Sequence, residues 1–238
     1  MSGWTSVNSP ITDTLTGISG RGSSTYDLVA VGAGVGLRGG TATFQQIPAI
    51  TWDLSAYMQD TVADGWAVGS GGTIVHFDGT WNELDNTNTN VTDDLYGVWA
   101  AGPTDVVAVG GDGSGALWTF NGTTWQSTAL ATTRSGLRAV SGFGSNVFAV
   151  GLGGTILQRK SGTWSAVASG TTDDLNAVHV VSSTQAWAAG ANGTVVRWNG
   201  TTWSAENVGL PIDLYAIQSN GTEVWAVGDL GSIFKRAP

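Results

Sequence analysis

The sequence predicts an all-β protein in which one four-stranded unit is repeated six times. A leucine opens each copy, and a glycine closes an Ala-Val-Gly-like run about 15 residues later. Composition agrees, because 36 glycines, 5 prolines and only 11% charged residues favour short strands joined by tight turns. The opening leucines are Leu15, Leu54, Leu95, Leu137, Leu175 and Leu214, and the closing glycines are Gly32, Gly69, Gly110, Gly151, Gly190 and Gly228.

Each segment of a copy has the pattern of a strand, as the fifth copy illustrates. Residues 174–180 alternate apolar and other side chains with a period of two, which predicts a half-buried innermost strand. Residues 186–190 and 193–198 predict the second and third strands. Asn199-Gly200 then predicts a tight turn into a fourth strand at Trp203, because Asn-Gly accepts the positive φ of such turns.

A period of about 40 residues that contains several short strands is typical of propeller blades. We therefore expect one domain, residues 1–238, folded as a six-bladed β-propeller with four antiparallel strands per blade. The expected blades cover approximately residues 11–46, 47–83, 84–127, 128–166, 167–205, and 206–238 plus 1–7.

The two ends of the chain predict how the ring closes. The sixth copy reaches Pro238 without a fourth-strand segment, while residues 2–7 resemble residues 161–167 of the fourth copy. We therefore expect the N-terminal segment to supply the outer strand of the last blade. Such closure covers strand edges that would otherwise favour aggregation.

Charge and composition narrow the partners and the compartment. Nine basic against 18 acidic residues give a net charge of −9, which argues against nucleic acid and anionic membranes. No apolar run approaches the roughly 18 residues of a membrane span, and the first residues lack the features of a signal peptide. We prefer a secreted or cell-surface location, with the cytoplasm as the alternative. The absence of cysteine leaves the redox compartment open.

Most of the 12 tryptophans recur at two positions of the repeat, which predicts packing between blades. Trp52, Trp99, Trp118 and Trp198 depart from these positions. Trp52 and Asp53 precede an inner strand, where we expect a loop at one mouth of the central channel. Trp99 stands where other copies carry mostly polar residues, so it is either a packing exception or part of a contact surface. The recurring tryptophans are Trp4, Trp81, Trp125, Trp164 and Trp203 on the fourth strand, and Trp66, Trp187 and Trp225 on the second.

The residue after each opening leucine varies most among otherwise similar strands. Tyrosine, arginine and asparagine at this position suit recognition of a sugar, which needs an aromatic plane and planar hydrogen-bond donors. The alternative is that these side chains fill the wedge between blades. The variable residues are Thr16, Ser55, Tyr96, Arg138, Asn176 and Tyr215. The candidate ligand-binding residues are Trp52, Asp53, Tyr96, Trp99, Arg138, Asn176 and Tyr215.

The recurring carboxylates and the two histidines do not form the pattern of a catalytic or metal-binding site. Aspartates precede four of the opening leucines, where we expect them to accept amide hydrogens in Asx turns rather than to bind calcium. His76 and His179 lie on different copies without a nucleophile motif, so we predict no catalytic residue, no metal site and no cofactor. A glycosidase with paired carboxylates remains a minor alternative.

The repeated motifs resemble those of known propeller families. Leu-x-Ala-Val, Val-Trp-Ala-Val-Gly, Gly-x-Ile and Gly-x-x-Trp are similar to repeats of tectonin and tachylectin-like lectins, and to BNR-type propellers that include photosystem assembly factors. Asp78-Gly-Thr-Trp81 is similar to the Asp-box turn of sialidase-like propellers. The first resemblance implies binding of glycans, and the second implies binding of another protein. We expect a non-catalytic carbohydrate-binding module, with a protein-interaction platform as the alternative.

Overall fold

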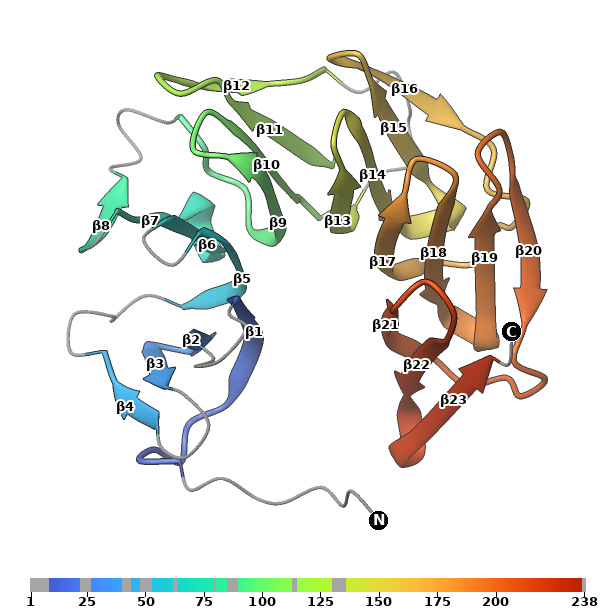
Figure 1. Ribbon diagram of the computed structural model, residues 1–238, viewed down its shortest axis with the longest axis horizontal. Coiled ribbons are helices and arrows are strands. Elements are labelled where there is room, and N and C mark those ends of the chain that lie inside the picture. The colour runs from blue at the N-terminus through green and yellow to red at the C-terminus, as the bar shows by residue number, and fades with distance from the viewer. Residues whose placement is uncertain are drawn as a thin grey trace.

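The computed structural model describes residues 9–21, 27–39, 44–47, 53–61, 64–78, 80–84, 90–112, 115–129 and 136–236. These residues form six antiparallel sheets arranged around a common centre (Figure 1). The predicted all-β class and the six-bladed propeller are confirmed. The expected N-terminal closing strand at residues 2–7 lies outside the described residues.

The first three blades each contain four strands in sequential order. Blade 1 consists of β1 (Leu15–Arg21), β2 (Asp27–Gly32), β3 (Val35–Gly39) and β4 (Phe44–Gln46). Blade 2 consists of β5 (Leu54–Thr61), β6 (Asp64–Gly69), β7 (Ile74–Phe77) and β8 (Trp81–Leu84). Blade 3 consists of β9 (Leu95–Gly102), β10 (Asp105–Gly110), β11 (Ala116–Phe120) and β12 (Trp125–Ser127).

Blades 4 and 5 repeat this order, whereas blade 6 has three strands in the described part of the chain. Blade 4 consists of β13 (Leu137–Phe143), β14 (Asn146–Gly151), β15 (Ile156–Lys160) and β16 (Thr163–Val167). Blade 5 consists of β17 (Leu175–Ser182), β18 (Gln185–Gly190), β19 (Thr194–Trp198) and β20 (Trp203–Asn207). Blade 6 consists of β21 (Leu214–Ser219), β22 (Val224–Gly228) and β23 (Ser232–Arg236).

The first strand of every blade faces the centre, and the fourth strand of blades 1 to 5 lies at the rim (Figure 1). The closing glycine is required because the end of the second strand passes very close to the residue before the opening leucine. A Cβ on Gly190 would lie 1.8 Å from the carbonyl oxygen of Asp174, and a Cβ on Gly110 would lie 2.0 Å from that of Asp94. The backbone there is extended, with a φ of −169° at Gly190. Glycine is therefore required by the close contact and not by a left-handed backbone conformation.

The hydrophobic core is divided between the blades. Each of the five consecutive pairs, from blades 1 and 2 to blades 5 and 6, shares one cluster of buried apolar side chains. Aromatic residues of the repeat lie in these clusters, which confirms the predicted packing role of Trp66, Trp125, Trp187 and Trp203. Burial of each such ring contributes roughly 1.5–3 kcal/mol.

The junction between blades 6 and 1, called the seam below, lacks such a cluster among the described residues. Leu15 is 40% exposed, although Leu95, Leu137, Leu175 and Leu214 at the same repeat position are fully buried. The two blades that flank the seam stand farther apart than consecutive blades elsewhere (Figure 1). The seam is therefore the one place around the described ring where matching apolar faces are left uncovered.

Candidate ligand site in the central channel

The variable residue after each opening leucine occupies a β-bulge. In blade 5, Leu175 pairs with Gly190 and Ala177 pairs with Ala189, which leaves Asn176 outside the ladder. A bulged residue is turned out of the regular pleat, and bulges occur often beside functional sites. We call the six bulged residues the bulge ring: Thr16, Ser55, Tyr96, Arg138, Asn176 and Tyr215.

The bulge ring lines a single cavity at the centre of the disc. This cavity has a volume of about 390 Å³, and all six blades contribute to its wall. The structure thus brings together four of the predicted ligand residues, Tyr96, Arg138, Asn176 and Tyr215. The inner strands that hold these four residues each begin at a fully buried leucine.

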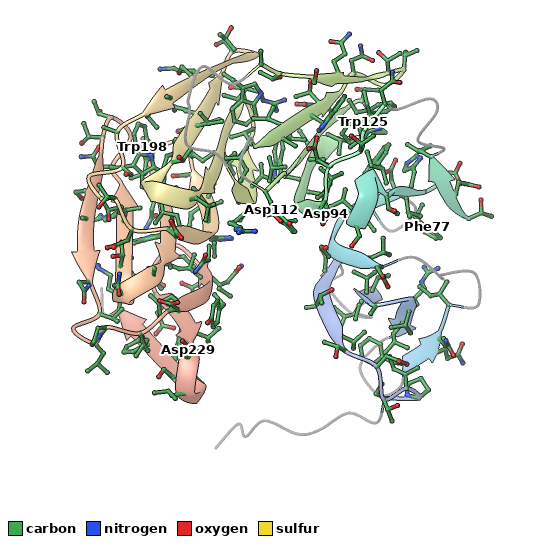
Figure 2. The ribbon with its side chains drawn as sticks, turned by 180° about the vertical axis from the view of Figure 1, so that it is seen from behind. Phe77, Asp94, Asp112, Trp125, Trp198 and Asp229 are labelled. Carbon is green, nitrogen blue, oxygen red and sulfur yellow. The ribbon has the colours of Figure 1, made fainter. Side chains whose placement is uncertain are left out.

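Tyr96 and Arg138 are two polar side chains that line the cavity and contact each other. The Arg138 guanidinium lies 5.0 Å from the centre of the Tyr96 ring, and its Nη1 is 3.3 Å from Oδ1 of Asp112. Burial raises the pKa of the Tyr96 hydroxyl, and a hydrogen bond to Asp112 raises it further. Asp94 and Asp112 lie close to the centre of the disc (Figure 2). Asp112 is therefore an acceptor shared by a phenol and a cation at the channel wall.

Tyr215 is a third polar side chain that lines the cavity. The residue is 56% exposed, and its hydroxyl donates a hydrogen bond of 2.9 Å to Oδ1 of Asp229. That bond raises the pKa of the Tyr215 hydroxyl. The exposed ring offers a flat apolar surface beside a carboxylate, which suits a cation with an aliphatic or planar body.

The remaining polar ring members mainly connect blades. Thr16 donates through Oγ1 to the carbonyl oxygen of Leu54 at 2.7 Å, and Asn176 donates through Nδ2 to that of Leu214 at 3.0 Å. Each side chain bonds to the next blade, so the predicted alternative of wedge filling applies to these two residues. The side chains of Arg138 and Tyr215 instead bond to the carboxylates of Asp112 and Asp229.

Trp99 is the packing exception that the sequence offered as one interpretation. Its side chain is 7% exposed in the cluster between blades 3 and 4, and its indole N–H donates to the carbonyl oxygen of Gly142 at 3.1 Å. The Arg159 guanidinium lies 5.4 Å from the ring centre. Trp99 does not line the central cavity. Trp52 lies outside the described residues, and Asp53 is exposed and bridges to Ala33.

Three of the four aspartates before the opening leucines, Asp94, Asp174 and Asp213, accept an amide of the preceding blade instead of forming the expected Asx turns. Oδ1 of Asp94 accepts the amide of Gly71 at 2.7 Å, and Oδ1 of Asp174 accepts that of Gly153 at the same distance. These amides belong to three-residue turns, η1 (Ser70–Gly72) and η2 (Leu152–Gly154). The carboxylates are thus structural links between blades.

The repeat pattern did not single out Asp112 and Asp229, the carboxylates that bond to Arg138 and Tyr215. Both follow a closing glycine closely, at a position where the corresponding turns of blades 2, 4 and 5 contain only glycine, serine, leucine, alanine and asparagine. A signal in the sequence could have identified them. Only the third and sixth copies carry an aspartate in this turn, and these two copies also carry a tyrosine directly after the opening leucine.

The histidines are engaged away from the channel wall. His76 stacks on Trp66 with 4.0 Å between ring centres and bonds to Asp64 at 3.2 Å. His179 lies 3.0 Å from the carbonyl oxygen of Ser219, and burial lowers its pKa. In the described part of the chain, no three His, Asp or Glu side chains are placed to hold a metal ion. The helical turns within it are too short to cross a membrane.

Known proteins resemble this chain in three-dimensional structure, whereas no family model and no curated protein sequence matches it. A structure of YCF48 bound to D1 peptide has a TM-score of 0.69 and 17% identity, and the match covers 95% of this chain and 78% of that one. The likeness is one of fold.

Two further structures show the same fold at lower identity. The WD40 repeats of RRP9 give a TM-score of 0.75 at 10% identity, covering 95% of this chain and 77% of that one. Virginiamycin B lyase from Staphylococcus aureus has a TM-score of 0.73 and 11% identity, and the match covers 94% of this chain and 84% of that one. The same architecture therefore occurs in an enzyme and in repeat proteins, and the channel residues must decide the function.

Proposed function

We propose that this protein is a non-catalytic binding module that holds an extended, positively charged segment of a partner protein at the central channel. The observation that carries the proposal is the bulge ring, because it directs the most variable side chains of six otherwise similar blades into one cavity. A fixed scaffold with an adjustable wall is the arrangement expected of a recognition site.

The cavity wall carries Arg138, but the carboxylates bonded to Arg138 and Tyr215 favour a cationic ligand. Asp229 lies beside the exposed ring of Tyr215, and Asp112 offsets the charge of Arg138. The chain as a whole carries a net charge of −9, which attracts basic partners at long range. A lysine or arginine of a peptide could stack on Tyr215 while its charged end bonds to Asp229. The peptide bound in the YCF48 structure supports protein binding as a use of this fold.

Two substitutions test this proposal. Tyr215→Ala removes the aromatic surface and Asp229→Asn removes the charge, so each should weaken binding about tenfold. The probe is an array of immobilised peptides graded by net charge, followed by fluorescence anisotropy of the retained basic peptides in increasing salt. Glu223→Gln is the matched control, since this carboxylate pairs with Lys235 outside the central cavity. Retention of acidic peptides, or equal affinity in all variants, would contradict the proposal.

Carbohydrate recognition is the second candidate. The exposed Tyr215 ring beside Asp229 also suits the apolar face of a sugar and its hydroxyl groups. The resemblance to tectonin and tachylectin-like repeats points the same way. A glycan array separates the two candidates, because sugar binding should require Tyr215 yet change little with salt, whereas binding of a basic peptide should weaken as salt increases.

A further inference from the structure

The third strand of blade 6 has an open side among the described residues. β23 pairs with β22 on one side, whereas β3, β7, β11, β15 and β19 each pair with an outer strand on the other. A strand edge of this kind can accept an extended segment through backbone hydrogen bonds.

In blades 3 and 5, a tryptophan of the fourth strand fills the apolar wedge between the blade and the preceding one. Trp125 pairs with Phe120 at the end of β11 and lies 5.7 Å from Trp66 of the preceding blade. Trp203 pairs with Trp198 and lies 5.0 Å from Phe148. Both fourth-strand tryptophans are less than 9% exposed, so each closes the apolar wedge between two consecutive blades.

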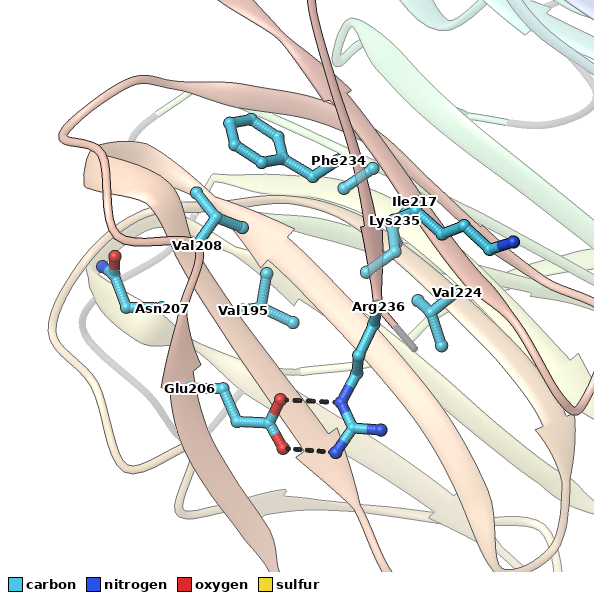
Figure 3. A pocket seen from close by; sticks show the side chains of 10 residues that line it. Val195, Glu206, Asn207, Val208, Ile217, Val224, Phe234, Lys235 and Arg236 are labelled. Carbon is cyan, nitrogen blue, oxygen red and sulfur yellow. Dashed lines mark hydrogen bonds and ion pairs between the residues drawn. The ribbon is translucent and has the colours of Figure 1, made fainter. Parts of the chain in front are cut away.

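The equivalent wedge between blades 5 and 6 contains a cavity of about 220 Å³ (Figure 3). Its lining corresponds in the repeat to the cluster that surrounds Trp125. Val195, Ile217, Val224 and Phe234 replace Ile74, Val98, Val106 and Trp118, respectively. Arg236 occupies the position of Phe120, 5.0 Å from the Trp187 ring and bonded to Glu206 at 3.1 Å. In the part of the chain that the structure describes, no fourth-strand tryptophan fills this cavity as Trp125 fills the corresponding wedge of blade 3.

We propose that residues 2–7 of the same chain add to the free side of β23 and place the Trp4 indole in this cavity. The segment carries the Gly-Trp pattern of a fourth strand. The register follows from blade 4, where Arg159 pairs with Trp164 and Gln158 with Ser165. Transferred to blade 6, it sets Trp4 opposite Arg236 and Thr5 opposite Lys235. Arg159 lies 6.0 Å from the Trp164 ring, so an arginine already accompanies such a tryptophan elsewhere in this protein.

The chain length between the segment and blade 1 fits this position. Residues 8–14 separate Val7 from the opening Leu15, just as residues 168–174 separate Val167 from Leu175. A docked segment would therefore lead into β1 as β16 leads into β17. It would draw blade 1 against blade 6 and cover the seam.

The exposed side chains at the seam are those that such closure would bury. Ile18 is 64% exposed, against 7% for Val98 and 6% for Ile217 at the same repeat position. On blade 6, Trp225 is 42% exposed, against 1% for Trp187. The two faces are the two halves of an interface that the molecule already forms five times.

Paired cysteines test the proposed register. The chain contains no cysteine, so Thr5→Cys with Lys235→Cys introduces the only two thiols, and residues directly opposite across antiparallel strands are within disulfide reach. We expect mild oxidation of a dilute sample to give a monomeric disulfide and no free thiol. The control is Thr5→Cys with Thr119→Cys, which targets the same repeat position on β11, already covered by β12. Free thiols in the test pair would overturn the proposal, and a disulfide-linked dimer would show that a second copy supplies the strand instead.

Substitution of Trp4 gives a second readout. Trp4→Ala should lower the melting temperature by about 10 °C, whereas Trp4→Phe should retain most of the stability. Removal of the indole should also increase quenching of Trp225 by iodide, because the seam would open. An unchanged melting temperature in Trp4→Ala would contradict the proposal.

Discussion

The carboxylate of Asp174 accepts a hydrogen bond of 2.7 Å from the backbone amide of Gly153, 21 residues earlier in the chain. The bond joins the start of blade 5 to a turn of blade 4, and Asp94 and Asp213 make the same connection between other blades. An aspartate before the opening leucine therefore ties the start of one blade to a turn of the preceding blade.

Loss of this bond should destabilise the propeller. Asp174→Ala leaves the amide of Gly153 without its charged acceptor, and we expect a decrease of about 2 kcal/mol in the free energy of unfolding. Asp174→Asn keeps an acceptor oxygen and should cost less. Urea unfolding measures both. The exposed Asp13 provides the matched control, and a loss as large in Asp13→Ala would mean that charge alone is responsible.

Trp99 should contribute to stability and not to ligand binding. Trp99→Phe removes the hydrogen bond from the indole N–H to Gly142 and leaves a small void, so we expect a loss of roughly 1–2 kcal/mol. Affinity for the peptides that bind the channel should stay the same. Thermal unfolding and anisotropy measured on one preparation separate the two effects, and weakened binding in the folded variant would restore Trp99 as a contact residue.

His179 should make the fold less stable in mild acid. Burial lowers its pKa in the folded protein, so the unfolded chain binds the proton more readily. The free energy of unfolding should therefore fall as the pH decreases from the ordinary histidine pKa of about 6.5 toward the lower folded value. His179→Gln should flatten this part of the profile. Parallel profiles for the two proteins between pH 7.5 and 5 would show that other groups cause the dependence.

Leu230 should be replaceable with a gain in stability. It adopts a φ of +57° in the turn η4 (Asp229–Gly231) and is 94% exposed, so its side chain is strained without being buried. Leu230→Gly relieves the strain, and we expect a gain of about 1 kcal/mol. Leu230→Ala retains the Cβ and serves as the control. A loss of stability in the glycine variant would indicate that the leucine makes a contact in solution, for example across a closed seam.

The repeat made the architecture predictable because its anchors have simple physical roles. Leu175 is buried between blades, and Gly190 passes too close to the Asp174 carbonyl for any Cβ. The glycine contact recurs in all six copies and burial of the leucine in five, so both appear in the sequence as a period. The variable residues stood out for the opposite reason, since the position turned toward the channel differs among otherwise similar inner strands.

Other features depended on register or on contacts distant in sequence. The bulge at Tyr96 shifts the pairing of β9 with β10 and so determines the direction of the Trp99 side chain. The residue pattern does not reveal this bulge. The partner of Asp174 lies in another blade, so local turn rules suggested the wrong acceptor geometry. Asp112 and Asp229 were overlooked because each occurs in a single copy.

The separate apolar clusters between consecutive blades determine how the molecule should lose its structure. Each sheet draws its free energy from two neighbours, as in a one-dimensional array of coupled units. Blades 2 to 5 share a cluster with both neighbours, whereas blades 1 and 6 each have one described cluster. Amide protons should consequently exchange slowest in the middle of the array and fastest in the two sheets beside the seam, so that opening spreads inward from one site.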